Sequence, residues 1–183
     1  MNKYLISTNQ STADLSSVGR AEDCSGLILV VILRFSDGKL VPDFIASTLR
    51  IKEAVPPFLQ PNLSDHELLS GVTFASAGSG WDELTTLATS AIPVSMQIDM
   101  FKDYLRRVKR IVSDDQEKAK KIISGALVVI STGTNDFGLN FYGIPTRRFQ
   151  FIAISAYQDF LLNNLQSFVK DLWKQREGVA EVE

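Results

Sequence analysis

The 183-residue sequence contains one cysteine, Cys24, and one histidine, His66. A single cysteine cannot form an intrachain disulfide, and one thiolate with one imidazole is too few for a zinc site built from Cys and His. We therefore expect no metal and no cofactor. Neither positive nor negative residues are in large excess, because the sequence has 19 Lys and Arg residues and 21 Asp and Glu residues. The resulting net charge of −2 gives no general attraction to nucleic acid, and we expect no nucleic-acid partner.

Long hydrophobic runs are missing as well. The longest is Leu27 to Leu33 (LILVVIL), far shorter than the roughly 20 residues of a membrane-spanning helix, so we expect no integral membrane segment. A buried strand is the simpler interpretation of this run. The residues before it are polar, Ser-rich and partly acidic, which is unlike a secretory signal peptide. The compartment and the oligomeric state are left open.

Two long stretches have the periodicity of amphipathic helices. Apolar residues between Met100 and Val112 recur at intervals of three and four, and a similar stripe runs from Tyr157 to Trp173. Between them, Ser113-Asp-Asp-Gln116 fits a capping box and predicts a further helix that ends near Gly125. These three helices account for much of the second half of the chain.

Two stretches are typical of strands. Ala126–Ser131 is a continuous apolar run, as expected for a central strand of a parallel sheet. Gly71–Ser76 alternates between apolar and polar residues and predicts a strand that leads into a glycine loop. Strands that alternate with helices in this order predict an α/β fold with a parallel sheet flanked by helices.

Each predicted strand is followed by a loop with hydrogen-bond donors. Ala75–Gly80 is rich in glycine, and Thr132–Asp136 contains an Asn amide. The carboxyl ends of parallel strands share one edge of the sheet, where ligands bind in such folds. Backbone N–H groups and an amide at this edge can stabilise an oxyanion. The same residues are also common in ordinary turns, so both interpretations stay open at this point.

A family resemblance favours the first interpretation. The stretches RFSDGKLVPDFIA, VPPFLQPNLSDHELLSGVTFASAGSGWDELT, ALVVISTGTNDFGLNFY and IPTRRFQF, in this order, resemble the plant GDSL esterase/lipase family of the SGNH hydrolase superfamily. The resemblance implies a three-layer, flavodoxin-like parallel sheet, of which this chain would hold an incomplete copy. It divides the chain into a divergent segment (1–33), a partial hydrolase domain (34–176) and a tail (177–183). Members of this family are typically secreted.

The resemblance also implies a function and site residues. The family hydrolyses carboxylic esters with a Ser-His-Asp triad, so the expected ligand is a small acyl ester or a lipid. The oxyanion donors would be Gly78 and Asn135, with Gly80, Gly133 and Asp136 as the supporting loop. The Asp136 carboxylate either orients a loop or caps the helix that follows it, and we expect the cap.

The catalytic blocks of the family are not found in this sequence. It contains no Gly-Asp-Ser, which carries the family's nucleophile, and no Asp-x-x-His, which carries its base. We therefore assign no catalytic residue and expect a truncated member that is inactive as written. The alternative to a hydrolase is a non-catalytic remnant that binds acyl or ester ligands or a partner protein. Ser36, His66, Ser76 and Ser79 are considered as substitutes for the missing groups and are not favoured, because no serine has a recognisable base.

Overall fold

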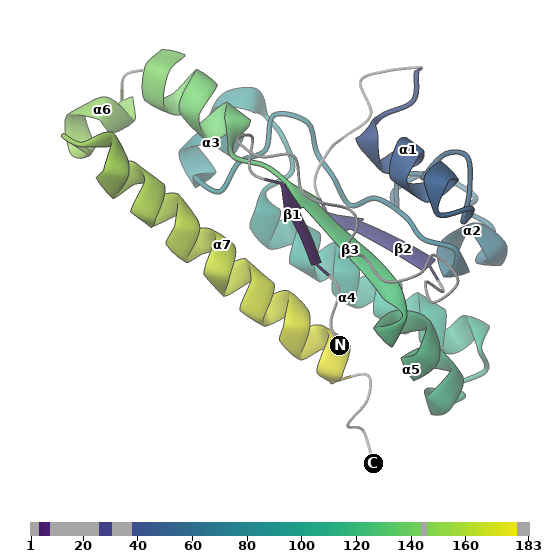
Figure 1. Cartoon of the computed structure of the whole chain (residues 1–183). Helices are drawn as coiled ribbons and strands as arrows, with labels where there is room; N and C mark the ends of the chain where they lie inside the picture. The colour runs from purple at the N-terminus through teal and green to yellow at the C-terminus, as the bar shows by residue number, and fades with distance from the viewer. Residues whose placement is uncertain (1–3, 8–25, 31–37, 144–145, 179–183) are drawn as a thin grey trace.

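The computed structural model of the chain describes residues 4–7, 26–30, 38–143 and 146–178 (Figure 1). Its elements are strands and helices, and most of the described residues are helical. In chain order they are β1 (Tyr4–Ser7), β2 (Gly26–Val30), α1 (Val41–Thr48), α2 (Asp65–Leu69), α3 (Glu83–Thr89), α4 (Val94–Ile111), α5 (Gln116–Ser124), β3 (Ala126–Ser131), the π-type helix η3 (Asp136–Gly143), α6 (Thr146–Gln150) and α7 (Ile154–Glu177). The fold is α/β.

The three strands form one parallel sheet in the order β1-β3-β2. Tyr4 of β1 is in register with Val128 of β3, and Gly26 of β2 is in register with Ala126. The predicted strand Ala126–Ser131 is therefore confirmed as the central one. The predicted strand in the run LILVVIL is confirmed as far as Val30, and the rest of the run lies outside the described residues.

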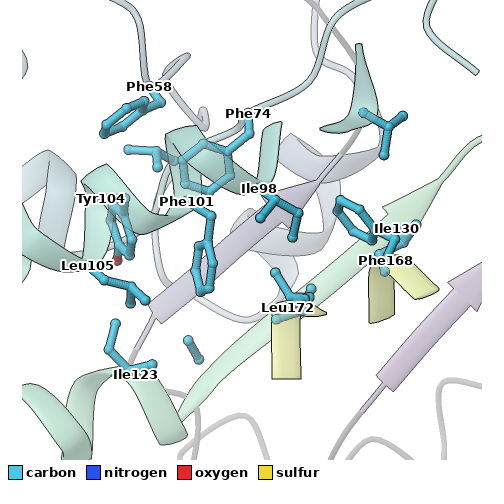
Figure 2. Packing of buried hydrophobic residues seen from close by; sticks show 14 of the residues in the cluster. Phe58, Phe74, Ile98, Phe101, Tyr104, Leu105, Ile123, Ile130, Phe168 and Leu172 are labelled. Atoms are coloured by element: carbon cyan, nitrogen blue, oxygen red, sulfur yellow. The ribbon is translucent and has the colours of Figure 1, made fainter. Parts of the chain in front are cut away.

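Both faces of β3 are covered. Val128 and Ile130 belong to the main hydrophobic core, which they share with residues of α4, α5 and α7 (Figure 2). The alternate residues Leu127 and Val129 belong to a second core with Val55 and residues of α1. A strand that is apolar on both faces explains why ALVVIS is a continuous hydrophobic run, since side chains alternate between the faces.

The predicted long helices are confirmed as α4 and α7, of 18 and 24 residues. They lie on the same side of the sheet and pack against each other (Figure 1). The predicted start of α5 is wrong by two residues. Ser113 and Asp114 both have a φ of 58°, so they turn the chain in the left-handed region instead of capping the helix. The N-cap is Asp115, whose carboxylate accepts a hydrogen bond from Lys118 N at 3.0 Å.

The strand predicted over Gly71–Ser76 is also wrong. Thr73 forms only an isolated parallel bridge with Pro57, in which Thr73 N donates to Pro56 O at 2.9 Å and Phe58 N donates to Thr73 O at 2.8 Å. Pro56 and Pro57 have no N–H groups, so the neighbouring segment cannot extend this bridge into a ladder. The apolar residues are buried nevertheless, because the Phe74 ring packs against the aromatic rings of α4 (Figure 2).

None of the helices in the described part of the chain is both long enough and apolar enough to cross a membrane.

Candidate functional site

Two loops meet beyond the carboxyl end of β3. We call them the glycine loop (Ala75–Gly80) and the amide loop (Thr132–Asp136). Asn135 Nδ2 donates a hydrogen bond to Ser79 O at 3.0 Å and so joins the two loops directly. The structure therefore brings together segments that are 56 residues apart in sequence. Only the amide loop follows a strand of the sheet, because the segment before the glycine loop forms no more than an isolated bridge.

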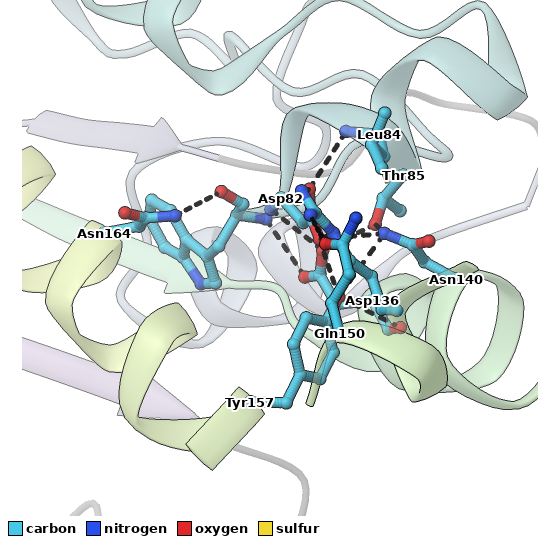
Figure 3. A network of polar contacts seen from close by, with 10 residues as sticks. Asp82, Leu84, Thr85, Asp136, Asn140, Gln150, Tyr157 and Asn164 are labelled. Atoms are coloured by element: carbon cyan, nitrogen blue, oxygen red, sulfur yellow. Dashed lines mark hydrogen bonds and ion pairs between the residues drawn. The ribbon is translucent and has the colours of Figure 1, made fainter. Parts of the chain in front are cut away.

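A second connection between the loops is made by the buried Asp136 carboxylate, which is 0% exposed (Figure 3). It accepts hydrogen bonds from Trp81 N and Asp82 N, both at 3.0 Å, and from Thr85 Oγ1 at 2.8 Å. The expectation that this carboxylate caps its own helix is wrong, since its described partners all lie 51 to 55 residues earlier in the chain. Its role is to orient the end of the glycine loop and the start of α3.

Gly80 makes this arrangement possible sterically. A Cβ at position 80 would lie 2.2 Å from Asp136 Oδ1 and 2.7 Å from its Cγ. Such distances are far inside van der Waals contact, so the carboxylate can approach the backbone only because residue 80 has no side chain. The glycine is needed here for close approach and not for an unusual φ.

Gly78 is required for its backbone conformation. Its φ is +88°, and a Cβ there would also lie 2.7 Å from Thr89 Cβ. Thr89 Oγ1 donates to Gly78 O at 2.9 Å, which fixes the peptide that follows Gly78. Gly133 has a φ of +105° but faces open space, so it serves the turn after β3 and not a close contact.

The carboxylate of Asp82 is the centre of a second polar cluster, just beyond the glycine loop (Figure 3). Arg147 binds it with two hydrogen bonds, from Nε at 2.7 Å and from Nη2 at 2.8 Å. Asn140 Nδ2 donates to it at 2.9 Å and the Tyr157 hydroxyl at 3.1 Å. Its Oδ1 also accepts from Leu84 N and thereby caps α3. These contacts link α3 to η3, α6 and α7.

The two carboxylates are shifted in opposite directions. Burial would raise the pKa of Asp82, but the hydrogen bonds and charge of Arg147, with the Leu84 N–H, hold that pKa below its usual value. Burial raises the pKa of Asp136 above its usual value, and the nearby charge of Asp82 adds to this, although the Asp82 N–H, the Thr85 hydroxyl and the Trp81 N–H act against it. Burial is also the main cause of the raised pKa of Tyr157. The surroundings therefore favour the charged form of Asp82 and disfavour that of Asp136.

The two serines of the glycine loop, Ser76 and Ser79, form hydrogen bonds with nearby backbone groups. Ser76 Oγ accepts from Ile92 N at 2.8 Å, and Ser79 Oγ donates to Ser76 O at 2.6 Å. Both residues are buried. His66 lies exposed on α2. Among the described residues, it makes no hydrogen bond to Ser76 or Ser79. Ser36 lies outside the described residues.

Sequence reasoning did not identify Asp82, Asn140, Arg147 and Tyr157 as parts of the site. Asp82 is the N-cap of α3, a position at which Asp is common, and nothing local in the sequence points to its partner Arg147, 65 residues later. Among the described residues, no group of three or more His, Cys, Asp or Glu side chains is placed to hold a metal ion.

Comparison with known proteins identifies the family of the chain. The family model for GDSL-like Lipase/Acylhydrolase matches residues 30–181. Among curated proteins, the GDSL esterases/lipases At2g31550 and At2g31540 of Arabidopsis thaliana are each 58% identical over 140 residues, 76% of this chain. GDSL esterase/lipase At5g45960 of the same plant is 46% identical over 149 residues, 81% of this chain. No solved structure matches.

The chain belongs to the GDSL esterase/lipase family, a family of plant hydrolases. The matched segment is 38% of the length of each of these relatives. The activity of the full-length relatives is therefore a proposal for this chain.

Proposed function

We propose that this chain provides the oxyanion-stabilising part of a site that hydrolyses carboxylic esters, with Gly78 N–H and the Asn135 amide as donors. The observation that supports this most is the hydrogen bond of 3.0 Å from Asn135 Nδ2 to Ser79 O. It holds the amide beside the glycine loop and uses one of its two N–H groups. The second N–H is then the group that we assign to the substrate.

The chemistry follows from where charge develops during ester hydrolysis. When a nucleophile attacks the ester carbonyl, the carbonyl oxygen becomes an oxyanion, and fixed donors stabilise it by about 3–4 kcal/mol each. Rigidity matters because donors that must reorganise lose part of this effect. Gly80, Gly133 and Asp136 are the supporting residues in this proposal, since Asp136 fixes the backbone that follows Gly80. The expected substrate is a small acyl ester or a lipid.

We also propose that the sheet belongs to the three-layer, flavodoxin-like architecture of SGNH hydrolases. Support comes from the parallel order β1-β3-β2 and from the burial of both faces of β3. We keep the proposed domain at residues 34–176, with 177–183 as a tail. Although 1–33 is divergent in sequence, β1 and β2 from this segment pair with β3.

A second candidate function is ligand binding without turnover. It is favoured by the sequence, which contains neither Gly-Asp-Ser nor Asp-x-x-His and has His66 as its only imidazole. Both serines of the glycine loop donate to or accept from the backbone around them. In this case the 183-residue chain would bind an acyl ester, or a partner protein, at the same loops and leave it intact.

One experiment separates the two candidates. The folded chain is treated with a fluorophosphonate, which labels activated serines, and any adduct is mapped by mass spectrometry beside a heat-denatured sample. We expect no labelling. Labelling of the folded sample alone would identify a nucleophile and would overturn the proposal of binding without turnover.

A second experiment tests the oxyanion donors themselves. Methyl butylphosphonate is a stable anion with the shape of the tetrahedral intermediate, and a ligand that binds only the folded state raises Tm. At ten times Kd the stabilisation is about 1.4 kcal/mol, or a few degrees in Tm for a chain of this size. We expect this rise for the unmodified chain and for the exposed control N163A, but not for N135A. An equal rise in N135A, or none in the unmodified chain, would overturn the assignment of Asn135.

A further inference from the structure

A groove of about 590 Å³ lies between α4 and α7, beside the start of α3. Its apolar wall consists of Trp81, Val94, Ile98, Phe160 and Phe168. Neither proposed oxyanion donor lines this groove, although Gly80 and Asp82 do. The groove is therefore a separate feature from the meeting point of the two loops, and its occupant is a separate question.

Aromatic rings form much of the wall. The Trp81 and Phe168 rings meet edge to face with centroids 5.3 Å apart. The groove already holds a cation against a ring, since the Arg147 guanidinium carbon lies 5.7 Å from the centroid of Phe160. Such contacts between cations and aromatic faces are worth roughly 0.5–2 kcal/mol, depending on how dry they are. The wall thus suits a ligand that is both apolar and positively charged.

The charges around the groove are not balanced. Four carboxylates line it, Asp82, Glu83, Asp99 and Asp171, against two cations. Arg147 is bound to Asp82, and Lys102 Nζ lies 2.8 Å from Asp99 Oδ1. Two carboxylates, those of Glu83 and Asp171, are exposed and have no cationic partner among the described residues. The rim therefore attracts a cation and repels an anion.

One buried polar group on the wall also has no partner. Thr86 lines the groove and is 3% exposed, and its hydroxyl makes no hydrogen bond among the described residues. A buried hydroxyl without a partner is unfavourable by about 1–3 kcal/mol, so a group that reaches it from the groove would gain a contact.

We propose that this groove binds a small amphiphile that carries an ammonium group. The apolar body lies against Trp81, Phe160 and Phe168, and the ammonium group lies near the free carboxylates of Glu83 and Asp171. This binding does not depend on the proposed ester chemistry, because it requires neither Gly78 nor Asn135.

The test compares three ligands of similar size: benzyltrimethylammonium, benzyl alcohol and benzoate. Trp81 serves as the reporter in the single-tryptophan variant W173F, and calorimetry on the unmodified chain provides a second readout. We expect benzyltrimethylammonium to bind more tightly than benzyl alcohol by about 2- to 30-fold from the cation–aromatic contact, with a further gain from the two carboxylates. Benzoate should bind most weakly. The preference should fall in 0.5 M NaCl, because salt screens the exposed carboxylates.

The double variant E83Q/D171N should reduce the preference for the ammonium ligand over benzyl alcohol to the part that the aromatic wall supplies, and the remaining preference should no longer depend on salt. Both residues are exposed, so the fold should tolerate the change. The matched control is E117Q/D159N, which removes two exposed carboxylates that do not line the groove and should keep the preference. Equal binding of the three ligands, no binding of any, or an unchanged preference in E83Q/D171N would each overturn the proposal.

Discussion

Replacing Gly80 with alanine tests whether the Asp136 carboxylate holds the glycine loop in place. The new Cβ would lie 2.2 Å from Asp136 Oδ1, so the carboxylate must retreat by about 1 Å to reach an ordinary contact distance. Its hydrogen bonds to Trp81 N and Asp82 N are 3.0 Å long, and a shift of this size breaks them.

The expected cost follows from the groups left without a partner. Two buried N–H groups and the Thr85 hydroxyl would lose their acceptor, at about 1–3 kcal/mol each. Relaxation of the loop recovers part of this, so we expect Gly80→Ala to lower the free energy of unfolding by about 3 kcal/mol. That is a large fraction of the 5–15 kcal/mol that is typical of a folded domain.

The measurement is equilibrium unfolding in urea, with two comparisons. Gly133→Ala is the control for glycine loss without a clash, since position 133 faces open space and its positive φ predicts a cost of only about 1–2 kcal/mol. In the background of Asp136→Ala, Gly80→Ala should add less than about 1 kcal/mol, because its target has been removed. Full additivity of the two changes, or a Gly80→Ala protein as stable as the unmodified chain, would refute the reasoning.

Four further predictions concern other polar contacts. Arg147→Ala should lower the free energy of unfolding by about 3 kcal/mol, because it leaves the buried Asp82 carboxylate unpaired, and Arg147→Lys should recover only part of this in urea unfolding. Folding lowers the pKa of Asp82, so the unmodified chain should have its full stability advantage over Asp82→Asn above about pH 4. The advantage should shrink as the pH falls below this value, and an advantage that grows in acid would contradict the prediction. Lys52 donates to two backbone carbonyls and is half-buried, and burial lowers its pKa to about 8, with a smaller opposing effect from a nearby carboxylate. The folded chain thus releases this proton before the unfolded chain does, and stability relative to Lys52→Met should rise between about pH 8 and about pH 10.4, where a flat difference would refute it. Tyr104→Phe should cost about 1 kcal/mol in thermal unfolding, because Leu68 O loses the hydroxyl that donates to it at 3.2 Å; no change in Tm would show that bond to be without effect.

The elements that sequence alone predicted are those whose signal is local. The periodic helices α4 and α7 and the apolar strand β3 were predicted because their own residues carry the pattern. The strand predicted over Gly71–Ser76 was wrong because its formation depends on a distant segment. Alternation of apolar and polar residues does not show whether a partner strand exists. The partner segment there begins with two prolines, and only one bridge forms.

The candidate site was predictable in position but not in detail. The glycine loop and the amide loop lie side by side as expected, although only the amide loop follows a strand of the sheet. The direction of the Asp136 carboxylate was not predictable. Its oxygens accept hydrogen bonds from the backbone N–H groups of residues 81 and 82, and backbone N–H groups leave no signal in a sequence. The pair Asp82–Arg147 was missed because each residue lies near the start of a different helix, where a charged side chain is usually exposed to solvent.

The long sequence separations in this network have a kinetic consequence. The amide hydrogens of Trp81 and Asp82 are held by an acceptor 55 and 54 residues further along, respectively, and Asn164 donates to the Trp81 carbonyl from 83 residues away. The glycine loop cannot supply these partners itself, so we expect it to become ordered only once β3 and α7 have docked. The two amides should consequently exchange with solvent deuterium as slowly as the centre of β3, although they lie in a loop.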